Sequence, residues 1–433
     1  MDNVTHTLAG LLLGEATVQL RTRRMRRTGG TGRAPSGAFR TAAAVAGAVG
    51  ANLPDADVLY TALAGDRLVY LLDHRGYTHT VVAALAGVGL VWLLGRWLAR
   101  RGDGADGANR ADDGRWLLPL AAAAVASHLL LDYTNSYGVH PFWPVRNDWY
   151  YGDAVFIVEP WLWVAAVPPL ALAARRRGVR AALLLVLGAG LALAWRVGLV
   201  PWPGALALTV GALVALAVAA RLAPGARVAV GLLGWLAVEG AFWTGTRAAR
   251  ARLAGPGVVD VIVTPLPAYP PCATAIVVAR ADDDGAPRYV LTTATVAAWP
   301  ALVPVARCGD AGRGDAGRGG AGSLVMRPAT RPSTAAVRWE RTWDAPLGEL
   351  AALARTNCQA AALLRFARAP FWFPVAGDSL HVGDLRYDRE PGLGFAELRV
   401  PARPAACPTG VPPWRPPRAD LIDAPIAAGM AAG

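Results

Sequence analysis

Long stretches without a single charged side chain constrain this chain more than any other feature. Ala181–Trp195 and Val197–Ala220 contain no charge at all, and similar apolar blocks recur from about residue 81 onward. A helix that crosses the hydrocarbon core of a bilayer needs about 20 mostly apolar residues. Only 17% of the 433 residues are charged, against roughly 25% in an ordinary soluble domain. The sequence therefore predicts an integral membrane protein.

Eight apolar segments are expected to enter the membrane, although the first two contain polar residues. They are residues 4–20, 41–63, 80–99, 116–135, 155–174, 181–200, 204–221 and 227–247. The predicted fold is mainly α, with a polytopic helical membrane bundle of about six to eight segments over residues 1–250. A small mixed α+β extramembrane domain is predicted over residues 255–433, where short β-branched runs replace the apolar blocks.

The net charge of +12 does not indicate nucleic-acid binding. Every basic residue is an arginine, and the arginines cluster at the ends of apolar segments, as in Arg21–Arg27, Arg96–Arg101 and Arg175–Arg180. This placement is typical of cytoplasmic loops. It puts the N-terminus, the arginine-poor loops and the C-terminal domain outside the cytoplasm, although Arg247, Arg250 and Arg252 argue mildly for the opposite orientation.

Within the C-terminal domain, five short runs predict strands and one longer run predicts a helix. The strands are Val258–Val263, Thr274–Ala279, Tyr289–Thr295, His381–Tyr387 and Phe395–Val400, the helix is Leu347–Ala367, and Arg307–Ser323 is a low-complexity loop.

All four cysteines fall in this domain, at Cys272, Cys308, Cys358 and Cys407. Outside the cytoplasm they would form up to two disulfides. Three pairings are open, and free buried thiols are the alternative.

Titratable residues gather in the first 160 residues. Five of the six histidines and several acids lie there: His6, His74, His79, His128, His140, Asp55, Asp57, Asp73, Asp132, Asp153 and Glu159. Charged groups within membrane segments are costly unless they are paired, hydrated or bound to metal. The gathering of so many such residues near the arginine-poor loops indicates that they share one role.

The spacing of these residues predicts a metal site. His128 and Asp132 are four residues apart, hence on one helix face, and imidazole with carboxylate suits Zn, Mn or Fe. A hydrogen-bonded pair inside a bundle is the alternative. Asp55 and Asp57 could bridge metals or divide into ligand and base, unless they belong to a solvated turn.

The predicted topology brings these strings together. His74 and His79 bracket a turn at Gly76 just before an apolar helix. The second segment ends outside, the third starts outside and the fourth ends outside, so all the strings converge on the outer membrane face.

These strings resemble the YdjM/YbcI-type (LexA-regulated) family, which is described as membrane-bound metal-dependent hydrolases. The matching strings are Met1–His6, Pro54–Asp57, His74–Thr80, His128–Asp132, the Gly138 to Pro144 stretch, Phe371–Pro374 and Val382–Tyr387. The placement of His and Asp ligands on helices is also loosely similar to that in zinc-dependent phospholipase C and P1-type nucleases. This analogy would suggest a phosphoester substrate.

The resemblance implies a hydrolase in the bacterial inner membrane. The predicted site at the outer membrane boundary favours an ester-type substrate that is lipid-linked or anionic. Asp55, His74, His79, His128 and Asp132, with His6 as a further ligand, would hold one or more divalent ions, zinc first and manganese or iron as alternatives. Asp57 is expected to act as general base, and Arg75 to neutralise anionic charge.

Two other classes of function stay open. In an ion- or proton-coupled transporter the same residues would form an ion path. However, the ligands crowd into the first 160 residues instead of recurring in two halves, as inverted repeats would require. A non-catalytic membrane scaffold with a structural metal is the second alternative. The sequence predicts the lipid bilayer as a partner and predicts no oligomeric state.

Overall fold

The computed structural model describes residues 1–27, 35–101, 107–283, 285–309, 324–388 and 393–423. Among them, eight helices form a bundle. They are α1 (Asn3–Arg27), α2 (Gly37–Gly50), α5 (Val81–Arg100), α6 (Gly107–Tyr133), α7 (Pro160–Ala173), α8 (Arg177–Arg196), α9 (Trp202–Arg221) and α10 (Pro224–Leu253). Each of the eight predicted segments thus corresponds to a bundle helix.

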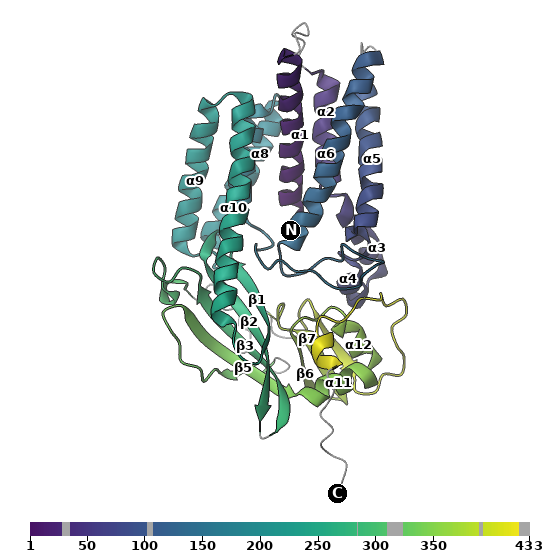
Figure 1. Ribbon diagram of the computed structural model, residues 1–433, viewed down its shortest axis with the longest axis vertical. Coiled ribbons are helices and arrows are strands. Elements are labelled where there is room, and N and C mark those ends of the chain that lie inside the picture. The colour runs from purple at the N-terminus through teal and green to yellow at the C-terminus, as the bar shows by residue number, and fades with distance from the viewer. Residues whose placement is uncertain (28–34, 102–106, 284, 310–323, 389–392, 424–433) are drawn as a thin grey trace.

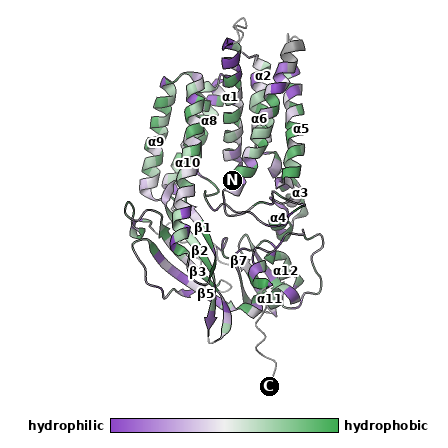
Figure 2. Ribbon diagram, viewed as in Figure 1, coloured by the Kyte–Doolittle hydropathy of each residue, from purple (hydrophilic) through white to green (hydrophobic). Residues whose placement is uncertain are grey.

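Five of the described helices are long and apolar enough to cross a membrane by themselves: α5, α6 from Asp112 onward, α8, α9 and α10. Figure 2 shows that α5, α8 and α9 are largely hydrophobic along their length. The helix α7 has 14 residues, fewer than the roughly 20 needed to span a bilayer. Together the apolar helices make this a membrane protein.

The arginine-rich ends of α1, α5 and α9 lie at the end of the bundle that is far from the strands (Figure 1). The last turn of α1 carries Arg24, Arg26 and Arg27, while α5 and α9 end at Arg100 and Arg221. The opposite end of the bundle meets the C-terminal domain. The last turn of α10 is the exception, because its Arg250 and Arg252 donate to carbonyls of the C-terminal domain.

The predicted segment 41–63 is not one continuous helix, and the prediction was wrong here. The helix α2 ends at Gly50, a 3-10 turn η1 (Leu53–Ala56) follows, and α3 (Asp57–Ala64) then begins. Pro54 lies in the first turn of η1 and cannot donate a backbone hydrogen bond, so it favours a new start over continuation of α2. This break carries Asp55 and Asp57 to the end of the bundle.

A second irregular segment joins α3 to α5. The helix α4 (Arg67–Asp73) is capped by Asp66, whose carboxylate accepts a hydrogen bond from the backbone of Leu68 at 2.7 Å. The 3-10 turn η2 (Tyr77–His79) follows, and the Thr80 hydroxyl then accepts from Ala83 to start α5. These short elements hold the His74–His79 string against the bundle.

The C-terminal domain begins with an antiparallel sheet of order β1-β2-β3-β5-β4. Its strands are β1 (Val258–Leu266), β2 (Tyr269–Asp283), β3 (Ala286–Ala297), β4 (Arg327–Pro328) and β5 (Val337–Pro346). The predicted strands at 258–263, 274–279 and 289–295 are confirmed within longer ones. Most of the predicted loop Arg307–Ser323 lies outside the described residues.

A smaller unit completes the domain. The helices α11 (Leu347–Thr356) and α12 (Cys358–Leu364) precede a sheet of β6 (Pro370–Val375), β7 (Ser379–Asp384) and β8 (Glu397–Pro401), and α13 (Ala419–Ile422) follows. The single predicted helix 347–367 is interrupted at Asn357, whose side chain caps α12 by accepting from Ala360 at 3.0 Å. A capping side chain favours a fresh helix start.

Two disulfides, Cys272–Cys308 and Cys358–Cys407, select one of the three pairings that the sequence left open. The first ties β2 to the segment after β3, and the second ties the start of α12 to the segment after β8.

One hydrophobic core joins the end of the bundle to this smaller unit. Leu71 and Leu72 of α4 pack in the same cluster as Phe366 and Trp414. The Trp414 indole donates to the carbonyl of Leu72 at 2.7 Å. The segment that precedes His74 is therefore held from the C-terminal side.

Candidate metal centre

Four side chains from three parts of the chain converge where the bundle meets the C-terminal domain. Asp55 comes from η1, His79 from η2, and His128 and Asp132 from the last turns of α6. The Nε2 atoms of His79 and His128 lie 3.0 Å apart, and the Asp132 Oδ2 atom is 3.0 Å from the first and 3.3 Å from the second. The Asp55 Oδ1 atom lies 3.5 and 3.4 Å from the same two nitrogens.

These separations fit ligands of one ion. Four ligands about 2.0–2.1 Å from a zinc ion in a tetrahedron lie roughly 3.3 Å from one another. The five separations given above span 3.0–3.5 Å around that value. Moreover, buried Asp55 Oδ1 receives no hydrogen bond from the described residues. An ion among these atoms would satisfy all four.

The surroundings fix the orientation of His128. Its Nδ1 atom lies 2.7 Å from the carbonyl oxygen of Ala51, which can only accept a hydrogen bond. Nδ1 therefore donates, and in the neutral ring the lone pair is left on Nε2, the atom that faces the cluster. Such an outer hydrogen bond is typical of metal-binding histidines.

A second group adjoins the first and shares Asp55 with it. Asp55, Asp57 and His74 also offer ligand atoms within 4.8 Å of one another. The His74 Nδ1 atom lies 3.1 Å from Asp57 Oδ1. The other oxygen of Asp57 accepts from the backbone of Arg75 at 3.0 Å and from the Thr78 hydroxyl at 2.9 Å. Asp57 is thus held by the string that contains the two histidines.

Both carboxylates at this end of η1 are kept ionised. Burial alone would raise the pKa of the Asp55 carboxyl, but contacts with His128 and His79 hold that pKa below its ordinary value. Burial likewise acts to raise the pKa of Asp57, but the contacts of its carboxylate with His74, His79 and the Arg75 backbone together lower that pKa. An ionised carboxylate is the form that binds a metal.

The two remaining predicted residues lie on the other oxygen of Asp132. His6 approaches Asp132 Oδ1 to 3.2 Å and stacks on the ring of His128, outside the set of four converging atoms. The guanidinium of Arg75 lies 3.0 Å from the same oxygen and donates to Asn135 at 2.9 Å. The amino group of Met1 also contacts this oxygen.

Four of the titratable residues named in the sequence analysis lie outside the cluster, among them Asp73, which belongs to neither ligand group. Asp153 pairs with Arg368 and Arg250, and Glu159 caps α7 and accepts from the backbone of Ala268. His140 stacks on Trp414 instead. Asp153 and Glu159 each already have a structural role.

Several residues that shape the centre gave no signal in the sequence. Asn135 and Ala51 were not expected to support the ligands, because amide side chains and backbone carbonyls occur everywhere. Trp414 packs against Gly76 from 338 positions away. The 3.0 Å approach that a Cβ at Gly76 would make to the Trp414 ring shows how closely this turn is covered. A long-range contact of this kind needs the fold.

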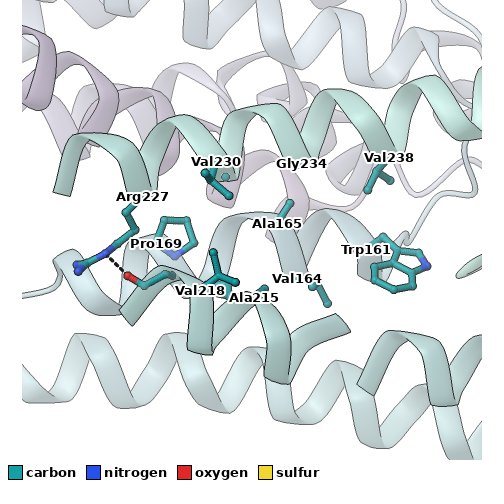
Figure 3. A pocket seen from close by; sticks show the side chains of 13 residues that line it. Trp161, Val164, Ala165, Pro169, Ala215, Val218, Arg227, Val230, Gly234 and Val238 are labelled. Carbon is teal, nitrogen blue, oxygen red and sulfur yellow. Dashed lines mark hydrogen bonds between the residues drawn. The ribbon is translucent and has the colours of Figure 1, made fainter. Parts of the chain in front are cut away.

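An apolar groove elsewhere in the bundle does not overlap this centre. It lies between α7, α9 and α10, and Figure 3 shows Trp161, Val164 and Val230 along its walls. Arg227 at one end donates to the carbonyl of Ala219 at 2.8 Å. The groove contains no carboxylate or histidine, so the chemistry of this chain points to the His/Asp cluster.

Comparison with known proteins agrees with the location of the cluster. No curated protein and no solved structure matches the chain. A family model described as YdjM inner membrane protein matches residues 1–199, which include every residue of the His/Asp cluster. Residues 1–199 are thus similar to the YdjM inner membrane protein family, the family that the sequence strings resemble.

Proposed function

We propose that this protein is a membrane-bound metal-dependent hydrolase. The observation that carries the proposal is the convergence of His79, His128, Asp132 and Asp55 at ligand-like separations, beside a second group that shares Asp55. Two imidazoles and two carboxylates form a donor set that suits zinc, with manganese or iron as alternatives.

A bound divalent ion would supply Lewis acidity and lower the pKa of a bound water towards neutrality. The chain supplies the rest. The carbonyl of Ala51 fixes the tautomer of His128, and the guanidinium of Arg75 with Asn135 orients Asp132. Asp57 is the candidate to accept a proton or to bind a further ion, and Arg75 is the candidate to face anionic charge.

An amphipathic or lipid-linked substrate is supported by the helix that leaves the site. α3 starts at Asp57 and exposes Leu59 and Leu63, whose exposed fractions are 72% and 88%. Exposed apolar side chains at the end of a membrane bundle favour contact with lipid. If the arginine-rich end of the bundle is cytoplasmic, this site and the C-terminal domain lie on the outer side.

The test begins with metal and then moves to turnover. Purified full-length protein in detergent should retain a transition metal, and the His128→Ala/Asp132→Ala double variant should release it from the four-atom group. The wild type should then hydrolyse at least one member of a panel of phosphoesters, lipid esters and amides. Equal metal content in the two proteins would rule out the assignment.

A structural metal in a non-catalytic scaffold is the second candidate. It is favoured by the four-atom group itself, because four protein ligands around zinc are typical of structural sites, whereas catalytic sites keep an open position. Tight metal binding without turnover of any panel member would favour this candidate over the hydrolase.

A further inference from the structure

We propose that the centre holds two divalent ions, and that the second is held by Asp55, Asp57 and His74 and faces the substrate. This inference deepens the proposed function and rests on it for the role of the second ion. It assigns Asp57 the role of a ligand in place of that of general base.

The first step is coordination number. The four-atom group already provides four protein ligands, which completes a tetrahedral zinc site. Hydrolysis needs an open position for water or for a substrate oxygen. The adjoining group provides three protein ligands and leaves such a position.

The second step is accessibility. The side chains of His79, His128 and Asp132 are fully buried. In the three-ligand group Asp57 is also fully buried, but His74 is 10% exposed, and Asp55, which both groups share, is 8% exposed. His74 therefore makes the three-ligand group the more accessible of the two.

The third step is geometry. The His74 Nδ1 and Asp57 Oδ1 atoms are 3.1 Å apart. Two neighbouring ligands about 2.1 Å from one ion lie roughly 3.0–3.4 Å apart, depending on whether they meet at an octahedral or a tetrahedral angle. Asp55 belongs to both groups, as a carboxylate that bridges two ions would. In two-metal hydrolytic sites the ions lie about 3.5–4 Å apart, within reach of one bridging carboxylate.

The fourth step is how the chain fixes Asp57. Arg75 has φ +61°, a left-handed conformation that is uncommon for residues other than glycine. This conformation accompanies the bond from the Arg75 backbone N–H to Asp57 Oδ2, and the Thr78 hydroxyl binds the same oxygen. Oδ1 is then directed at His74. Strained backbone that aims a side chain in this way is typical of ligand sites.

The fifth step is charge. Asp55, Asp57 and Asp132 bring three carboxylates into one buried region, and both the Arg75 guanidinium and the Met1 amino group pair with Asp132. Buried charge without compensation is strongly unfavourable. An ion in the four-ligand group would compensate Asp55 and Asp132, and a second divalent cation would compensate Asp57, whose carboxylate pairs with no arginine side chain among the described residues.

The experiment counts zinc ions on the full-length protein in detergent. Protein stripped with a chelator is titrated with Zn²⁺ against a chromophoric competitor, and bound zinc is measured after dialysis. We expect two equivalents for the wild type and one for His74→Ala and for Asp57→Asn. Asp73→Asn removes a carboxylate from the same string that belongs to neither group, and this matched control should keep two.

A second measurement guards against variants that misfold. Co²⁺ added to the wild type should give two spectroscopically distinct increments, one for each coordination environment. A single equivalent of zinc together with a single Co²⁺ increment would overturn the proposal, as would two equivalents in both His74→Ala and Asp57→Asn.

The result is separable from that of the proposed function. If the wild type holds one ion and hydrolyses a panel substrate, the proposal of a second ion fails and the proposed hydrolase function stands. A wild type that holds two ions, one of them lost in His74→Ala, supports the second site even when no substrate is turned over.

Discussion

At the scale of single residues, the centre depends on hydrogen bonds that lie behind the ligands. Thr78 has the clearest such role. Its hydroxyl donates to Asp57 and lies 3.0 Å from Nδ1 of the His79 ring. One side chain thus contacts a member of each of the two ligand groups.

Replacing this hydroxyl tests its role. We expect Thr78→Val, which keeps the branched shape, to weaken zinc binding or turnover about 10–100-fold, the usual effect of losing a partner behind a metal ligand. Thr78→Ser keeps the hydroxyl and should stay close to the wild type. Competitive zinc titration measures both variants, and equal affinity in Thr78→Val and the wild type would show that the bond does not matter.

The ligands could be predicted from the sequence, whereas their supports could not. His128 and Asp132 are four residues apart on a helix, and that spacing alone puts them on one face. Asn135 supports Arg75 only because the chain turns sharply after α6. Helical periodicity predicts the pairing of His128 with Asp132 but not the contact between Arg75 and Asn135.

At the scale of elements, buried ion pairs attach the loop after α6 to the C-terminal domain. The Arg368 guanidinium contacts both oxygens of Asp153 at 2.9 Å and also binds Asp260 at 2.8 Å. Arg368 and Asp153 are buried, and Arg250 shares the second carboxylate oxygen. This network joins the loop to the start of β1 and to the segment before β6.

Breaking that network should be costly. Arg368→Met leaves buried carboxylates short of a partner, and losing one member of a buried pair typically costs about 3–5 kcal/mol. Arg250 and Arg418 still contact Asp153 and Asp260, so the lower end of that range is expected. The control is Arg415→Ala, an exposed pair at 3.4 Å that should cost at most about 1 kcal/mol. Thermal unfolding in detergent compares them, and similar midpoints would contradict the assignment.

A pH dependence belongs to the segment between β7 and β8. Burial, followed by the neighbouring Glu397 carboxylate, raises the pKa of Asp388 to about 6, and His381 acts in the opposite direction. The unfolded chain ionises Asp388 at a pH of about 4. The proton-bound form therefore stabilises the fold below about pH 4, and this contribution is lost as the pH rises through about 6.

The substitution Asp388→Asn should remove this dependence. We expect its unfolding midpoint to exceed that of the wild type at pH 7 and to vary less between pH 4 and 6. Thermal unfolding of both proteins across that range is the measurement. Parallel pH profiles for the two proteins would mean that Asp388 does not titrate in this way.

Element boundaries were predicted where composition changes abruptly and missed where it does not. The apolar blocks correspond to eight helices, yet residues 41–63 were predicted as one segment because apolar runs flank the polar break at Asn52 to Asp57 on both sides. The strand β5 was missed because its polar and charged residues, as in Arg338-Trp339-Glu340-Arg341, lack the usual strand composition. Pairing with β3 overrides that composition.

At the scale of the whole molecule, the arginine-rich ends of α1, α5 and α9 and the disulfide-containing domain lie at opposite ends of the bundle (Figure 1), whereas the arginines at the end of α10 lie beside that domain. Arginine-rich loops favour the cytoplasmic side of a membrane, and structural disulfides persist in compartments outside it. These two independent arguments favour the same orientation, with the C-terminal domain and the His/Asp centre on the outer side.

That orientation is tested by a reporter fused after the C-terminal domain. We expect an alkaline phosphatase fusion to be active and a fusion to a reporter that works only in the cytoplasm to be inactive.

The disulfides provide a second test. On non-reducing gels the protein should migrate faster than after reduction, and the Cys358→Ser/Cys407→Ser variant should lose part of the shift, since the 49-residue separation between these cysteines is no longer closed. Loss of such a disulfide typically costs about 2–5 kcal/mol, so the thermal midpoint should fall as well. Cytoplasmic reporter activity would invert the molecule and place the metal centre on the inner face, where a substrate would have to be supplied from the cytoplasm.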